Sequence, residues 1–180
     1  MACLLAGCRS PLSHAVERTS LDARYTMVAH PDLPAAKGDE GCGAQALAVA
    51  LARFDPAIDV QQLCDALPWH DSGATVVDLI VAARKRGYEV SLHQGTVQIL
   101  REAVAADHIA LVLLDVQTEV WSVFGWWSSA ALMHWAVVSG TSDDAIVLAG
   151  RGRSYLVEAT FFDARWAASS RCTLIVAGKK

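Results

Sequence analysis

The sequence predicts a single α+β domain in which N-terminal helices pack on a C-terminal antiparallel sheet. Segments with helical composition come first along the chain, and most strand-like segments follow them without an alternating strand–helix repeat. The length of 180 residues is appropriate for one domain with a sizeable core, since domains typically contain about 100 to 150 residues. We therefore expect one active site.

Three helices are predicted in the first half of the chain. From residue 42 the sequence contains good helix formers that are apolar on nearly every side, a pattern typical of a buried helix. A second, short helix is predicted over 59–67, and a third over 74–86, where Gly87 closes it.

The hydrophobic period changes after Gly87. Strands are predicted over 88–93 and 109–114, with a helix over 97–106 between them. A Trp-rich loop with Trp121, Trp126 and Trp127 follows. The remaining elements are mainly strands, predicted at 133–139, 145–148, 154–158 and 172–176, with a helix at 160–166 between the last two.

The composition is apolar but indicates neither a membrane span nor a nucleic-acid surface. Hydrophobic residues make up 53% of the chain, yet no run approaches the roughly 20 apolar residues that cross a bilayer. The formal net charge is −4, and the basic residues are scattered apart from a short cluster at 84–86. Without a basic stripe to contact phosphates, we expect no nucleic-acid partner.

Residues 1–8 end in Leu-Ala-Gly-Cys and resemble a shortened bacterial lipoprotein signal, in which cleavage before the cysteine leaves it to carry lipid. The segment is shorter than a signal h-region of about 7 to 15 residues and has no preceding basic residue, and a start codon assigned too late would explain both. Residues 9–30 lack clear periodicity and predict a tether before a domain at 31–180. We expect a cell-envelope protein anchored to the membrane through Cys8; the alternative is a cytoplasmic protein with a chance apolar N-terminus.

The number of cysteines indicates that at least one thiol is free. If Cys3 is removed and Cys8 carries lipid, Cys42, Cys64 and Cys172 remain, an odd number that leaves at least one unpaired. Cys64 lies in a helical stretch and Cys172 opens an apolar strand, so we expect both to be small buried hydrophobes. No CxxC motif or zinc-ligand spacing occurs, and we expect no metal and no other cofactor.

Gly41-Cys42-Gly43 opens the buried helix and is the first candidate for chemistry. The positive end of a helix dipole stabilises a thiolate, and the flanking glycines permit a tight entry turn and the close approach of a substrate backbone. The N–H groups of the first turn can point at a developing oxyanion. Taken alone, the motif is better explained as a loop-to-helix transition.

His134 favours a catalytic interpretation of Cys42. It opens the strand His-Trp-Ala-Val-Val-Ser-Gly, where a side chain at the edge can reach a cleft. The other five histidines lie in or beside the tether, in loops or at the end of an ordinary strand. A cysteine at a helix start followed by a histidine at a strand start is the order found in cysteine hydrolases. The pair predicts Cys42 as nucleophile and His134 as general base.

The stretch from 41 to 176 resembles the bacteriocin-processing, double-glycine-leader cysteine peptidase family of the papain-like superfamily. The matching segments are Gly-Cys-Gly-Ala-Gln-Ala-Leu-Ala at 41–48, Ser-Gly-Ala-Thr-Val-Val-Asp-Leu-Ile at 72–80, Ala-Ala-Arg-Lys-Arg-Gly at 82–87, His-Trp-Ala-Val-Val-Ser-Gly at 134–140 and Phe-Phe-Asp-Ala-Arg-Trp at 161–166. The chain is most similar to the stand-alone, lipoprotein-type branch, which also carries a Trp-rich loop before the His strand. The resemblance implies a papain-like fold, a peptide or protein substrate and cleavage after small residues, with Cys42 and His134 in the roles above.

The chain departs from the family at the oxyanion hole. The family has a Gln about half a dozen residues before the cysteine, whereas residues 35–41 read Ala-Ala-Lys-Gly-Asp-Glu-Gly. Loss of one oxyanion donor typically costs about 100- to 1000-fold in rate. Lys37 could substitute as a donor, although a solvated loop lysine is the simpler interpretation.

A second departure concerns the acid that orients the histidine, which the family places on the strand after the His strand. A turn over 140–144 would put His134 across from Gly150, where neither Gly150 nor its neighbours carry a carboxylate. Asp143 and Asp144 are interpreted as turn formers too far along the strand to reach the ring. The alternatives are a backbone carbonyl near Gly150, Asp115 or Gln117.

Three function classes follow. The first is a cysteine peptidase that cleaves after small residues. The second is a weakly active or inactive domain of the same fold that binds peptide segments, favoured by the two departures. The third is another thiol acyltransferase, such as a transglutaminase-like or peptide-ligating enzyme.

Overall fold

The computed structural model describes residues 16–18, 25–28, 41–68, 73–115, 118–121, 127–130, 133–150 and 153–179. Five helices lie in these ranges: α1 (Cys42–Ala52), α2 (Val60–Ala66), α3 (Val76–Arg84), α4 (Val97–Ala105) and α5 (Ala159–Ala167). They correspond to the five predicted helices within a few residues at each end. None of the helices in the described part of the chain is long and apolar enough to cross a membrane.

Local chemistry explains where these helices begin and end. The Asp59 side chain accepts a hydrogen bond from the first turn of α2, and the Thr96 side chain does the same for α4. Thr75 and Asp78 form a reciprocal capping box at the start of α3. The chain leaves α3 through Gly87 at a φ of +85°, a conformation that favours glycine.

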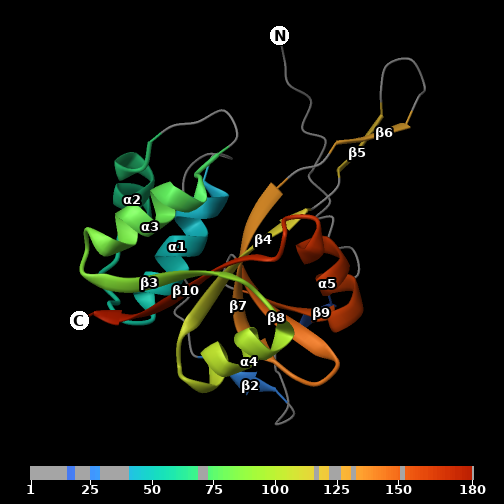
Figure 1. Ribbon diagram of the computed structural model, residues 1–180. Coiled ribbons are helices and arrows are strands. Elements are labelled where there is room, and N and C mark those ends of the chain that lie inside the picture. Colours follow the sequence, from blue (N-terminus) through green and yellow to red (C-terminus); the bar gives the residue numbers. More distant parts are fainter. Residues whose placement is uncertain are drawn as a thin grey trace.

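One antiparallel sheet forms the body of the domain. Its strand order is β1-β9-β8-β7-β4-β10-β3, and β2 pairs with β7 off this path. The strands are β1 (Val16–Arg18), β2 (Thr26–Met27), β3 (Tyr88–Gln94), β4 (Ile109–Asp115), β7 (Met133–Thr141), β8 (Ala145–Gly150), β9 (Arg153–Glu158) and β10 (Cys172–Lys179). Figure 1 shows α1, α2 and α3 gathered at the side of the sheet where β3 and β10 lie, with α5 beside β9. The predicted α+β class and helix-then-sheet order are confirmed.

The core lies between α1 and the middle of the sheet. Helix α1 packs against β7 and β4, and Ala46–Ala52 is buried along its whole length. On β4 the residues from Ile109 to Val112 have no exposed surface. A helix enclosed on all sides needs small or apolar residues on every face, which is the pattern that predicted it.

The structure differs from the sequence prediction in the stretch predicted as a tether. Within 9–30, β1 pairs with β9, and β2 pairs with β7. Strand pairing uses backbone groups, so a two- or three-residue strand can join a sheet without the side-chain periodicity from which strands are predicted.

The Trp-rich segment predicted as a loop also contains paired strands. β5 (Thr118–Trp121) and β6 (Trp127–Ala130) form a separate two-stranded sheet, which lies apart from the main sheet in Figure 1. Valine, threonine and tryptophan are common in strands, and that composition was the signal in the sequence that could have indicated the hairpin.

Candidate active site

Cys42 is the first residue of α1 and one of the few residues of that helix that are not buried. Its thiol is free and half-buried, whereas the helix from Ala46 onward is enclosed. Gly41 precedes it as the N-cap, and no described side chain caps this end of the helix. The first intrahelical bond runs from the Gln45 N–H to the Gly41 carbonyl at 2.7 Å. The N–H groups of residues 42–44 therefore have no carbonyl partner within the helix and can serve an anion.

His134 is the second residue of β7, directly after Met133. It is half-buried, while every residue from Trp135 to Thr141 is buried. Its cross-strand partner on β4 is Leu114. The strand thus enters the core one residue after the histidine, and a side chain at this end of the sheet can reach over its edge.

The starts of α1 and β7 are in contact through the residues that follow Cys42 and His134. A Cβ atom added to Gly43 would lie 2.9 Å from Ala74 Cβ and 3.0 Å from Trp135 Cδ1, so only glycine fits there without a shift of its neighbours. The Trp135 indole also donates a hydrogen bond from Nε1 to the Ala74 carbonyl, at 3.1 Å. This packing fixes the start of α1 beside the start of β7.

The sequence did not predict the packing role of these residues. Gly43 was expected to allow a tight entry turn, and Trp135 to belong to an apolar run. An indole needs a partner for its N–H when buried, so the tryptophan next to the candidate histidine was the available signal. Its partner, Ala74, lies 61 positions away in the chain, a contact that periodicity does not predict.

Asp115 is the last residue of β4 and pairs with Met133, immediately before the Leu114–His134 pair. The residue is only 9% exposed, and its Oδ1 atom is buried without a hydrogen-bond partner in the described part of the protein. Buried polar atoms nearly always have a partner, and each exception calls for an explanation.

The strand pairing corrects the position expected opposite His134. Val137 pairs with Ala149, so Gly150 falls opposite Ala136 and not opposite His134. The last pair before the turn is Thr141 with Ile146, so the hairpin turns later than expected, and a β-bulge between Val138 and Gly140 shifts the register again. The residues that would face His134 from this side lie outside the described residues. The sequence of β8 nevertheless contains no carboxylate.

Asp143 and Asp144 lie in the turn after β7, as predicted from the sequence. Asp143 is fully exposed and forms an ion pair with Arg101 at 3.3 Å. Asp144 accepts a hydrogen bond from Ser142 within the turn. Both residues are at the opposite end of β7 from His134.

The other two described thiols lie in environments that raise their pKa. Burial raises the pKa of the Cys64 thiol, and the negative charge of neighbouring Asp65 raises it further. Burial also raises the pKa of Cys172. Both side chains pack against the hydrophobic core, in agreement with their predicted role as small hydrophobes.

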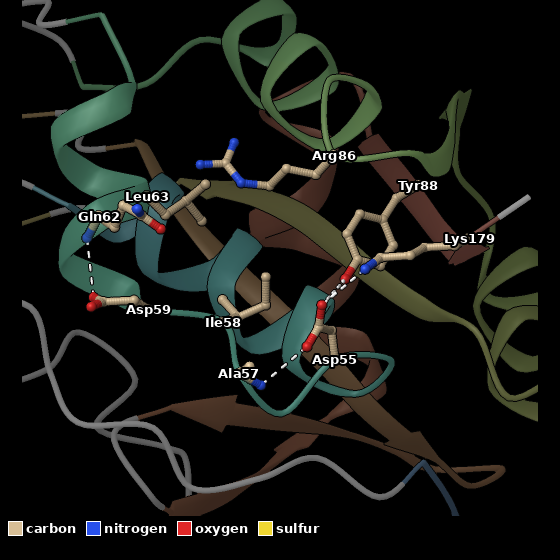
Figure 2. Close-up of a pocket in the computed structure, with 9 residues that line it drawn as sticks. All are labelled: Asp55, Ala57, Ile58, Asp59, Gln62, Leu63, Arg86, Tyr88 and Lys179. Atoms are coloured by element: carbon tan, nitrogen blue, oxygen red, sulfur yellow. Dashed lines mark hydrogen bonds and ion pairs between the residues drawn. The ribbon is translucent and has the colours of Figure 1, made fainter.

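A hollow of about 290 Å³ lies at the far end of α1 from Cys42. Figure 2 shows its lining, where Asp55 faces Lys179 and Tyr88. The Asp55 carboxylate accepts hydrogen bonds from Lys179 Nζ at 2.9 Å and from Tyr88 Oη at 3.5 Å, and the bond from Lys179 lowers the Asp55 pKa. Since the 11 residues of α1 extend about 16 Å, this hollow is separate from the Cys42 region, and two of its charged residues, Asp55 and Lys179, pair with each other.

Several predicted features lie outside the described residues: Cys8, Lys37 and Gln117. Among the residues that are described, no cluster of three or more His, Cys, Asp or Glu side chains is arranged to bind a metal ion.

The sequence profile described as "Peptidase C39 family" matches residues 35–169. A search of curated proteins gave no match.

Three solved structures have similar folds. The peptidase domain of Streptococcus ComA, described as a bifunctional ABC transporter involved in a quorum-sensing pathway, is 15% identical over 82% of this chain and 97% of its own, with a TM-score of 0.61. A double-glycine-motif protease from an AMS/PCAT transporter, in complex with the leader peptide, is 16% identical over 83% and 92%, with a TM-score of 0.59. A C39-like peptidase from Bacillus anthracis is 14% identical over 79% and 90%, also with a TM-score of 0.59. At such identities these three structures support the fold alone.

Proposed function

The chain belongs to the peptidase C39 family, and on that premise we propose that it cleaves peptide bonds after small residues through Cys42 as nucleophile and His134 as general base. The family and the papain-like fold predicted from the sequence are confirmed, and membership of the family supports a cysteine peptidase. The assignment of the two residues, the substrate preference and the lipoprotein-type branch are our proposals.

The observation that carries the proposal is the contact between Gly43 and Trp135. It brings the backbone at the start of α1 close to the backbone at the start of β7, so the two candidate residues are near each other although they lie far apart in the sequence. Both candidates are half-buried, so each keeps some access to solvent while its element is anchored in the core. A nucleophile and a base on adjacent rigid elements are what thiol-dependent acyl transfer requires.

The proposed mechanism follows from the two positions. Cys42 as thiolate attacks the carbonyl carbon of the scissile bond, and the N–H groups at the start of α1 stabilise the oxyanion. His134 as imidazolium gives its proton to the leaving amine, and the C–N bond breaks to leave a thioester on Cys42. His134 then takes a proton from water, the hydroxide attacks the thioester, and the C–S bond breaks to release the carboxylic acid product and to restore the Cys42 thiolate beside the His134 imidazolium.

Two observations support a substrate with small residues before the scissile bond. Gly41 directly precedes Cys42, and without a side chain it lets a substrate backbone come close to the sulfur. A structurally similar protease with a double-glycine motif was solved in complex with a leader peptide. We propose a peptide or protein substrate whose last residues before the cut are Gly or Ala.

A second candidate, a weakly active or inactive peptide-binding domain, is favoured by one observation. Strand β8, next to the histidine strand, carries no carboxylate to support His134. The same protein would then bind peptide segments without turning them over at a useful rate.

We also propose that the protein is held at the bacterial cell envelope by lipid on Cys8. The support is the Leu-Ala-Gly-Cys sequence at the N-terminus.

The test of function is hydrolysis of peptides that vary at the two residues before the cut, with products identified by mass spectrometry. Cleavage after Gly-Gly or Gly-Ala, lost in Cys42→Ala, is the expected result. Tight peptide binding without cleavage would favour the binding domain. Formation of an amide with an added amine, in excess over hydrolysis, would indicate an acyltransferase.

A further inference from the structure

Asp115 is a mostly buried residue with one carboxylate oxygen that lacks a partner among the described residues. The residue is 9% exposed, and its Oδ1 makes no hydrogen bond in the described part of the chain. Burial of a polar oxygen without a hydrogen-bond partner costs folding free energy. A side chain that destabilises the fold is more readily explained by a role in the reaction than by a role in packing.

The pairing of β4 with β7 places this carboxylate close to His134. Asp115 pairs with Met133, and the next pair is Leu114 with His134. The Cα atoms of Asp115 and His134 are thus separated by one strand spacing and one residue, about 6 Å.

The same register defines how the carboxylate can act. Side chains alternate along a strand, so those of Asp115 and His134 leave the sheet on opposite faces. The register therefore favours an effect through the field of the charge over a direct hydrogen bond to the ring. In a protein interior such a field acts over several ångströms, because little water screens it.

We propose that Asp115 is the negative charge that stabilises the imidazolium form of His134, in place of a carboxylate on β8. This inference rests on the proposed function of Cys42 and His134. It assigns Asp115 no contact with the substrate and no step in proton transfer.

Among the described residues, three other charged or titratable groups near this end of the sheet have partners or are neutral. Asp78 of α3 accepts hydrogen bonds from the Thr75 N–H and hydroxyl. Arg171, just before β10, forms a two-point ion pair with Asp163. Cys172 of β10 stays a neutral thiol, because burial raises its pKa.

The decisive variant is Asp115→Asn, which removes the charge and keeps the shape. A negative charge favours the protonated form of every titrating group near it. Removal of the charge therefore lowers the pKa of both groups of the Cys42–His134 pair. The acid and alkaline limbs of the pH–rate profile should both move to lower pH, by about 0.5 to 1 pH unit. The matched control is Asp143→Asn, the same chemical change at an exposed turn at the other end of β7.

The measurement is the rate of Cys42 alkylation by iodoacetamide against pH, with the pH profile of peptide hydrolysis beside it. We expect the Asp115→Asn profile to move to lower pH, the Asp143→Asn profile to coincide with that of the unchanged protein, and the melting temperature of Asp115→Asn to be equal or higher. Coincident profiles for all three proteins would overturn the inference and leave the proposed function intact. Loss of folding in both Asp115→Asn and Asp115→Ala would also overturn it, because Asp115 would then be structural. If Cys42 in the unchanged protein reacted no faster than Cys64 and Cys172, the proposed function and this inference would both fail.

Discussion

Gly43 lies directly against the indole ring of Trp135, and this contact holds the start of α1 to the start of β7. Each residue immediately follows a member of the proposed catalytic pair. The relative position of Cys42 and His134 therefore depends on a contact that contains neither of them. Small changes at this contact should affect catalysis as well as stability.

Gly43→Ala is the direct test of that contact. The new methyl group would lie about 3 Å from both the Ala74 side chain and the Trp135 ring, so the neighbours must move. We expect a loss of roughly 1 to 3 kcal/mol in the free energy of unfolding and at least a tenfold loss in kcat/KM. The control is Gly178→Ala, where the nearest atom to the added methyl group lies at 3.6 Å. Full activity in Gly43→Ala would show that the contact does not position the site.

The thiols should differ in reactivity. At pH 6 to 7 we expect iodoacetamide to alkylate Cys42 faster than Cys64 or Cys172, because burial raises the pKa of the latter two thiols and keeps them protonated. Peptide mapping by mass spectrometry after timed labelling measures the three rates. Protection of Cys42, or equal rates at all three positions, would indicate that Cys42 is only a packing residue.

The turn carboxylates should be dispensable. We expect Asp143→Asn and Asp144→Asn to retain wild-type kcat/KM, and Asp143→Asn to keep the stability of the unchanged protein, since its ion pair with Arg101 is exposed to solvent. Steady-state kinetics and thermal unfolding check both statements. A large loss of activity in a folded variant would place the orienting acid in this turn.

Lipid attachment predicts a cysteine-dependent location. The native gene product should partition with membranes, and Cys8→Ser should release it, because the thiol that would carry the lipid is gone. Fractionation of cells expressing each form, with immunodetection, measures this. A soluble distribution for both forms would show that the protein is not anchored to the membrane through Cys8.

The helices could be predicted because their signals are local. The apolar composition around α1 and the capping residues Thr75 and Thr96 act within a few positions of the chain. The Cys–His pairing could also be proposed from sequence, since it depends only on the order of a helix start and a strand start.

The remaining features depend on contacts that the sequence does not encode locally. The residue opposite His134 differs from the predicted Gly150 because the hairpin turns later than expected, and the bulge between Val138 and Gly140 then shifts the register by one residue. Pairing of β1 with β9 uses backbone groups, which carry no residue signature. Asp115 was one of several candidates near the histidine, and only its burial without a partner for Oδ1 distinguished it.

The most direct test of the central claim is a double-mutant comparison of Cys42→Ala, His134→Ala and the combined variant in peptide hydrolysis. Two groups that act as one unit are strongly non-additive, so each single change should abolish turnover and the combination should cost no more than either alone. Circular dichroism and thermal unfolding of each variant confirm that the fold is retained. Turnover that survives Cys42→Ala, or losses that add between the two positions, would contradict the Cys42–His134 mechanism.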